Sequence, residues 1–112
     1  MNNIKLTKDA DALICLIYKY YLELHDIGFS KADAKILGSS EEILQNIIPE
    51  WTFNDVDDTL RELDRAGLLS ILYAEDICYE VILNDEAIIY MENRFSKKIN
   101  DIIKYIELIK FW

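Results

Sequence analysis

Residues 53–83 read FNDVDDTLRELDRAGLLSILYAEDICYEVIL, and this stretch decides the fold because its hydrophobic period changes midway. Its first half repeats apolar side chains at three- and four-residue steps, at Phe53, Val56, Leu60 and Leu63. That spacing predicts an amphipathic helix over Phe53–Ala66. Thr52 is a favourable N-cap, and Gly67 supplies the residue after the helix end.

The second half predicts a β-hairpin, because Leu69–Ala74 and Ile77–Leu83 are rich in Ile, Val, Leu and Tyr. Glu75-Asp76 separates the two strands. Glu and Asp are poor residues for a two-residue primed turn, so we expect a loop slightly longer than two residues. Alternation along the second strand would place four side chains on one face: Ile77, Tyr79, Val81 and Leu83.

Three helices are predicted upstream of this stretch. The first covers Lys8–Ile27 and the second, a short one, covers Lys31–Leu37. The third begins after Ser39, which forms a capping box with Glu42, and it ends before Pro49.

One long helix is predicted downstream, from Asp85 to about Phe111. An apolar stripe runs along it through Ile88, Met91, Phe95, Ile99, Ile102, Ile103, Ile106 and Ile109. We find no internal repeat or linker. The sequence therefore predicts a single domain over residues 1–112 of the α+β class, mostly α, with a core of about 8–93 and a C-terminal extension of 94–112.

Composition excludes several classes of protein. The chain has 112 residues, of which 52% are hydrophobic, and the net charge is −9. A disordered chain would be less apolar. The longest uncharged apolar run, Ala12–Tyr18, is far shorter than a membrane span, and no secretory signal precedes it. Cys15 and Cys78 do not make a disulfide framework. We therefore expect a soluble cytoplasmic protein that does not bind membranes.

The charge is unevenly distributed along the chain. Residues 39–93 carry fourteen acids against Arg61 and Arg65 alone, a net charge of −12. Residues 94–112 carry a net charge of +3. The middle of the chain therefore has a strong negative field, and the C-terminal segment a weak positive one.

With the short second helix left aside, the predicted order of helix, helix, helix, hairpin and helix is that of a winged helix-turn-helix. Residues Phe53–Leu69, FNDVDDTLRELDRAGLL, resemble the third helix of that superfamily and its entry to the wing. Residues Tyr79–Asn93, YEVILNDEAIIYMEN, resemble the second wing strand and following helix of small bacterial and prophage proteins of this fold, the YjcQ-like group. This resemblance covers roughly residues 39–93 and implies a two-stranded hairpin wing.

The resemblance implies that the third helix enters a DNA groove and that the wing touches the DNA backbone. Carried over to this chain, the contact positions are Asn54, Asp55, Asp57, Asp58, Thr59, Arg61, Glu62 and Arg65. The wing tip is Glu75-Asp76. DNA affinity comes largely from Lys and Arg at phosphates, so carboxylates at these positions oppose it. Arg61 and Arg65 lie four residues apart and could contact DNA together, but we favour pairing with nearby acids along the helix.

Two functions remain open on this evidence. The first is a small, dimeric DNA-binding transcriptional regulator of bacterial or phage origin. The second is a winged-helix interaction module that does not bind DNA. Its acidic face, within Glu41–Glu92, would bind a basic protein partner or mimic the charge of DNA.

The apolar stripe of the last helix needs a covering surface. Its candidate packing residues are Phe95, Ile99, Ile102, Ile106, Ile109 and Trp112. MarR-type winged helices dimerise through N- and C-terminal helices, and this resemblance favours a homodimer. Packing against the first helix of the same chain, where Ile14, Tyr18 and Tyr21 leave spare apolar width, is the alternative.

No pattern in the sequence indicates an enzyme. His25 is the single histidine, and neither cysteine lies beside it, so we expect no metal site and no cofactor. Cys15 and Cys78 lie in apolar runs and are interpreted as core residues. Phosphate-binding glycine motifs and nucleophile elbows are absent from a chain with only three glycines.

Overall fold

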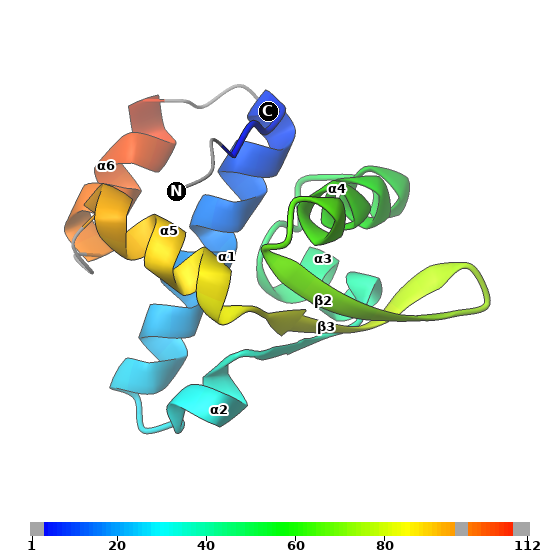
Figure 1. The fold of residues 1–112 in the computed structure, drawn as a ribbon, viewed down its shortest axis with the longest axis horizontal. Helices are drawn as coiled ribbons and strands as arrows, with labels where there is room; N and C mark the ends of the chain where they lie inside the picture. The colour runs from blue at the N-terminus through cyan, green and yellow to red at the C-terminus, as the bar shows by residue number, and fades with distance from the viewer. Residues whose placement is uncertain (1–3, 96–98, 109–112) are drawn as a thin grey trace.

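The computed structural model describes residues 4–95 and 99–108. Its helices are α1 (Lys8–Asp26), α2 (Lys31–Ala34), α3 (Ser40–Asn46), α4 (Phe53–Arg65), α5 (Asp85–Phe95) and α6 (Ile99–Leu108). Its strands are β1 (Ile36–Gly38), β2 (Leu69–Ala74) and β3 (Ile77–Leu83). In Figure 1, α5 and α6 lie on one side of α1, and α3, α4 and the hairpin lie on the other. The expected α+β, mostly α class is confirmed.

Helix boundaries follow the predicted caps. Thr7 accepts a hydrogen bond from the Ala10 amide at the start of α1. Ser39 and Glu42 form the full capping box of α3. Thr52 accepts a hydrogen bond from the amide of Asp55 at the start of α4. These bonds satisfy amides that the first turn of a helix leaves without partners.

Strand β1 corrects the sequence prediction, which extended the second helix to Leu37. The helix ends at Ala34, and Ile36 pairs with Ile82 of β3 instead. The carbonyl of Lys35 accepts a hydrogen bond from the amide of Leu83. Backbone pairing with β3 therefore replaces the helical bonds that local sequence favoured. The three antiparallel strands take the order β1-β3-β2.

The hairpin has the predicted strands but not the predicted loop. Ala74 pairs with Ile77, so Glu75-Asp76 is a two-residue turn and the expectation of a longer loop was wrong. Both turn residues have positive φ, 54° at Glu75 and 65° at Asp76. This is the backbone of a type I′ turn, whose twist matches that of the flanking strands.

A bulge also changes which residues of β3 face the core. Tyr73 pairs with Cys78 while Leu72 pairs with Glu80, which leaves Tyr79 as an extra residue. Cys78 is buried and Tyr79 is 59% exposed. The prediction that Tyr79 would share the inner face with Val81 was therefore wrong, because simple alternation fails across a bulge.

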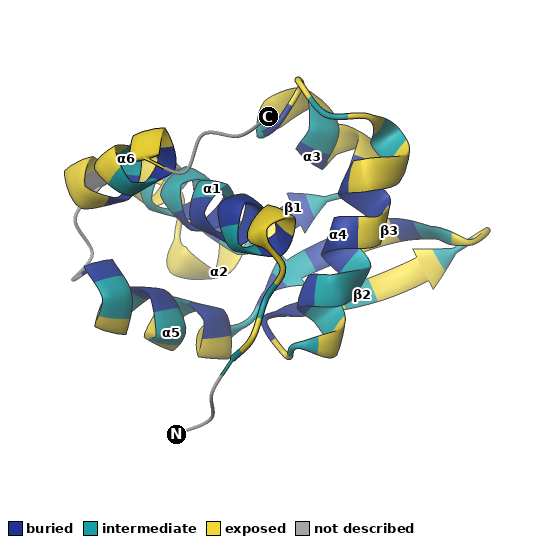
Figure 2. Cartoon of the chain, turned by 90° about the horizontal axis from the view of Figure 1, so that it is seen from above, coloured by how far each residue is buried: buried dark blue, intermediate teal, exposed yellow. Residues whose placement is uncertain are grey.

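Helix α1 is the centre of the core. Figure 2 shows buried residues along most of its length, with the other elements arranged around it. Leu13, Ile14 and Ile17 are completely buried, and so is Cys15, as predicted. No helix in the described parts of the chain is long and apolar enough to cross a membrane.

The predicted single helix over Asp85–Phe111 is two helices in the structure, α5 and α6. A straight helix of that length would extend about 40 Å, which exceeds the longest dimension of the molecule, 37 Å. As two shorter helices, the segment packs against α1, where Ile102 and Ile106 join the core. Phe95 is also buried there.

These contacts agree with the intramolecular alternative for the apolar stripe. Ile14, Tyr18 and Tyr21 of α1 are buried, as that alternative requires. The side chain of Ile99, and Ile109 and Trp112, lie outside the described residues. The homodimer stays a prediction. The side chains that are buried within the chain would not be available to its interface.

A partly buried charge cluster fastens α5 and α6 to α1. Arg94 donates two hydrogen bonds to the carboxylate of Asp11, at 2.6 and 3.2 Å, and Tyr105 donates a third at 2.6 Å. Burial acts to raise the pKa of Asp11, but the bonds from Arg94 and Tyr105 hold it below its usual value. The Arg94 guanidinium also lies over the Tyr105 ring, 4.5 Å from its centroid.

We expect Arg94→Ala to lower the free energy of unfolding by about 1–3 kcal/mol, because it leaves the half-buried Asp11 carboxylate without its cation. Urea denaturation followed by circular dichroism measures this. Arg65→Ala, at an exposed arginine, is the control and should change stability by less than about 0.5 kcal/mol. Equal effects of the two variants would contradict the role assigned to Arg94.

The double substitution Glu75→Asn with Asp76→Gly should raise the free energy of unfolding by about 0.5–1 kcal/mol, because both new residues tolerate positive φ better. Thermal melting provides the measurement. A lower melting temperature would show that the turn is not of the primed type.

Candidate functional site

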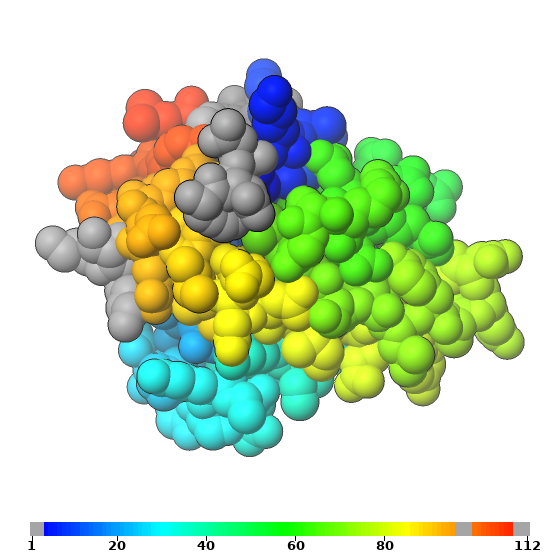
Figure 3. Space-filling view, in the orientation of Figure 1, coloured from blue at the N-terminus to red at the C-terminus, as the bar shows by residue number. Residues whose placement is uncertain are grey.

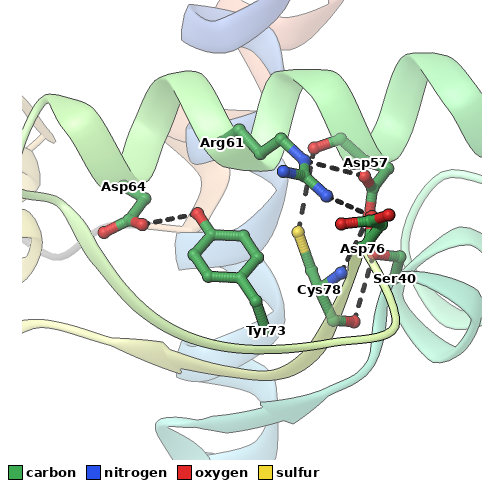
Figure 4. A network of polar contacts seen from close by, with 7 residues as sticks. All are labelled: Ser40, Asp57, Arg61, Asp64, Tyr73, Asp76 and Cys78. Carbon is green, nitrogen blue, oxygen red and sulfur yellow. Dashed lines mark hydrogen bonds and ion pairs between the residues drawn. The ribbon is translucent and has the colours of Figure 1, made fainter.

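Helix α4 and the hairpin lie side by side. They carry the residues that the sequence analysis predicts to contact DNA or a protein partner. The buried side of α4 carries Val56, Leu60 and Leu63. The hairpin extends beyond the body of the protein, with its turn at the far end (Figure 1). A polar network connects the two elements (Figure 4).

Asp57 is the centre of this network. Its side chain is 9% exposed. One carboxylate oxygen accepts hydrogen bonds from the Ser40 hydroxyl at 2.6 Å and from the Cys78 amide at 3.0 Å. The other accepts one from Nε of Arg61 at 2.9 Å. One carboxylate thus joins α3, α4 and β3.

Arg61 extends the network to the hairpin turn. Its Nη2 donates a hydrogen bond to the carbonyl oxygen of Asp76. Its guanidinium also lies over the ring of Tyr73, 4.9 Å from the centroid. Tyr73 in turn donates a hydrogen bond of 2.6 Å to Asp64. The arginine is therefore bound on several sides by groups of its own chain.

The electrostatics of the network favour a fixed ion pair. Burial alone would raise the pKa of Asp57, but hydrogen bonds from Ser40, Cys78 and Arg61 lower it to about 2. Burial is also the main cause that raises the pKa of the Cys78 thiol to about 11. A thiol with that pKa is a poor nucleophile near pH 7.

The structure divides the predicted contact residues of α4 into two groups. Asp57 and Thr59 are buried, and Arg61 and Glu62 are bound internally. Glu62 accepts hydrogen bonds from the amide and hydroxyl of Thr7, so it holds the start of α1. These four residues therefore contact or are enclosed by their own chain, and their role as partner contacts stays a prediction.

The second group is exposed and mostly acidic. It comprises Asn54, Asp55, Asp58 and Arg65 on α4, together with Glu75 and Asp76 at the turn. We call Asp55, Asp58, Glu75 and Asp76 the acidic face. Because Arg61 links α4 to the turn, the two parts of this face keep a fixed relation to each other.

Apolar side chains are exposed on the same hairpin. Leu72 and Tyr79 are each 59% exposed, and Ile36 on β1 is 49% exposed. Ile36 pairs with Ile82, and Ile82 pairs with Ser70, so apolar side chains of β1 and β3 adjoin a polar residue of β2 on this side of the sheet.

Sequence reasoning missed three members of the network: Ser40, Tyr73 and Cys78. The spacing of Asp57 and Arg61 indicated their ion pair. Nothing local indicated that Ser40 and Cys78, 17 and 21 residues away from Asp57, would meet at the same carboxylate. Among the described residues, no group of His, Cys, Asp and Glu side chains has the arrangement of a metal site.

Comparison of the chain with models of protein families, with curated proteins and with solved structures finds no match. The function must therefore be inferred from the site itself.

The central role of Asp57 can be tested by comparing Asp57→Asn with Asp58→Asn, its exposed neighbour. The pKa of Asp57 lies below the unfolded value near 4, so its ionised form stabilises the fold above that pH and loses this effect as the pH falls toward 2. We expect Asp57→Asn to lower the free energy of unfolding near neutral pH by about 2–3 kcal/mol, and Asp58→Asn to change it by less than about 0.5 kcal/mol.

Chemical denaturation between about pH 2 and pH 7 provides the measurement. The stability of Asp57→Asn should depend less on pH than that of the wild type on the acidic side. A variant as stable as the wild type near neutral pH would overturn the assignment.

Proposed function

We propose that this protein is a winged-helix-type interaction module that binds a basic protein partner through the acidic face. Element order supports the winged-helix assignment. Helix α1, strand β1, helices α3 and α4 and the β2–β3 hairpin follow in sequence, and the sheet order is β1-β3-β2. The resemblance to YjcQ-like proteins supports the same arrangement, with α4 as the third helix and the hairpin as the wing.

The state of Arg61 carries this proposal. A DNA-binding helix needs free cations for the phosphates. Arg61 is instead held by Asp57, by the Asp76 carbonyl and by the ring of Tyr73. Breaking these contacts to release it would leave the Asp57 carboxylate buried without a cation. Arg65 is then the exposed cation of α4, a helix that also exposes Asp55 and Asp58.

The exposed charges favour a basic partner. Asp55, Asp58, Glu75 and Asp76 would repel phosphates and attract lysine or arginine. In Figure 3 the hairpin projects from the body of the molecule, which makes its turn accessible. The exposed Leu72 and Tyr79 supply apolar contact area that a peptide or protein can cover. A partner with both basic and apolar side chains fits both features.

Two probes distinguish this function from DNA binding. The first is a labelled DNA duplex of mixed sequence, and the second is a labelled peptide of alternating Lys and Leu. We expect fluorescence anisotropy to show peptide binding that weakens with salt, and no duplex binding even at low salt. The substitutions Asp55→Asn with Asp58→Asn should weaken peptide binding about three- to tenfold.

A charge-matched control separates a local effect from that of total charge. Asp26→Asn with Glu107→Gln removes two exposed carboxylates from α1 and α6, on the opposite side of the molecule from the hairpin (Figure 1). This variant should bind the peptide as the wild type does. Salt-sensitive binding of the duplex, weakened by Arg65→Ala, would instead favour a DNA-binding regulator and contradict the proposal.

A further inference from the structure

A pocket on the other side of the molecule is not explained by the acidic face. It lies between α1, α2 and α5 and has a volume of about 350 Å³. Tyr21, Leu22 and Ile88 give it apolar walls. Atoms of α1 are visible between the yellow of α5 and the cyan of α2 in Figure 3. This volume lies within the range that small-molecule sites usually have.

Tyr18 gives the first indication of a ligand. Its side chain lines the pocket and is 1% exposed. Among the described residues, its hydroxyl is the one buried side-chain polar atom that has no hydrogen-bond partner. Burying a hydroxyl without a partner destabilises a protein, so such an atom calls for an explanation.

Tyr18 shares its end of the pocket with Glu92. Burial raises the pKa of Tyr18 to about 12, and the charges of Glu92 and Tyr21 add to that increase. Glu92 and Tyr21 both line the pocket. Helix α5 runs antiparallel to α1, because Arg94 binds Asp11 near the start of α1 while Asp85 pairs with Lys35 beyond its end. Glu92 and Tyr18 therefore lie toward the same end of the pocket.

The opposite end of the pocket is basic. His25 and Lys31 line it, and Lys35 forms an ion pair with Asp85 at 2.5 Å. Tyr18 and His25 are seven residues apart on α1, which is about 10 Å along a helix. The pocket therefore offers an unused hydroxyl beside a carboxylate at one end, apolar walls between, and basic groups about 10 Å away.

We propose that this pocket binds a short zwitterionic peptide of about three residues with apolar side chains. An extended chain advances about 3.3–3.6 Å per residue, so three residues span the two ends. The peptide ammonium donates a hydrogen bond to the Tyr18 hydroxyl oxygen and interacts with Glu92. The peptide carboxylate meets Lys31, and the side chains lie against Leu22 and Ile88. This site is separate from the acidic face and does not depend on its function.

Isothermal titration calorimetry with the tripeptide Leu-Ala-Leu tests the proposal. N-acetylation of the peptide removes the ammonium, and C-terminal amidation removes the carboxylate. We expect each modification to weaken binding about tenfold or more, as does loss of a hydrogen bond to a charged group. Lys31→Gln should weaken binding of the unmodified peptide and leave binding of the amidated one unchanged.

Tyr18→Phe provides the decisive variant, with Tyr20→Phe, a half-buried tyrosine outside the pocket, as its control. Tyr18→Phe should weaken binding of Leu-Ala-Leu about tenfold but leave binding of the N-acetylated peptide unchanged. Thermal melting should find Tyr18→Phe at least as stable as the wild type, because the hydroxyl that it removes has no partner. Absence of Leu-Ala-Leu binding at millimolar concentration, or equal binding by Tyr18→Phe, would overturn the proposal.

Discussion

The carboxylate of Asp57 is the contact on which the functional side of this protein depends. It accepts hydrogen bonds from Ser40 of α3, from the Cys78 amide of β3 and from Arg61 one helical turn along α4. Buried carboxylates need such donors, because burial without them opposes the charge. The same contacts fix Arg61 against the hairpin turn. Stability and surface charge are therefore coupled, since the arginine that completes the network is bound by groups of its own chain.

Local sequence signals predicted the elements but not how they meet. The caps at Thr7, Ser39 and Thr52 set helix boundaries that the structure confirms, because each cap acts within one turn. Strand β1 was missed because its pairing with β3 joins residues about 45 positions apart in sequence. The burial of Asp57 was missed for the same reason, since its helical spacing to Arg61 was visible but its contacts with Ser40 and Cys78 were not.

The turn and the C-terminal helices differ from the predictions because long-range contacts outweigh local preference. Glu75-Asp76 is an unfavourable pair for a type I′ turn, but Arg61 holds the carbonyl of Asp76 in place. The segment after Asp85 has the periodicity of one long helix. Contacts of Arg94 and Tyr105 with Asp11 instead hold two shorter helices against α1, which leaves α1 covered on both sides. Neither the contact of Arg61 with Asp76 nor the contacts at Asp11 can be recognised from residues that are close together in the sequence.

The central claim is that Arg61 is a structural cation and takes no part in binding nucleic acid. The Nε–Hε signal of Arg61 in a ¹H–¹⁵N NMR spectrum tests it most directly. We predict a slowly exchanging signal that is lost in Asp57→Asn and that does not move when duplex DNA is added at low salt. A signal that exchanges rapidly with solvent in the wild type, and that shifts on addition of the duplex, would contradict the account.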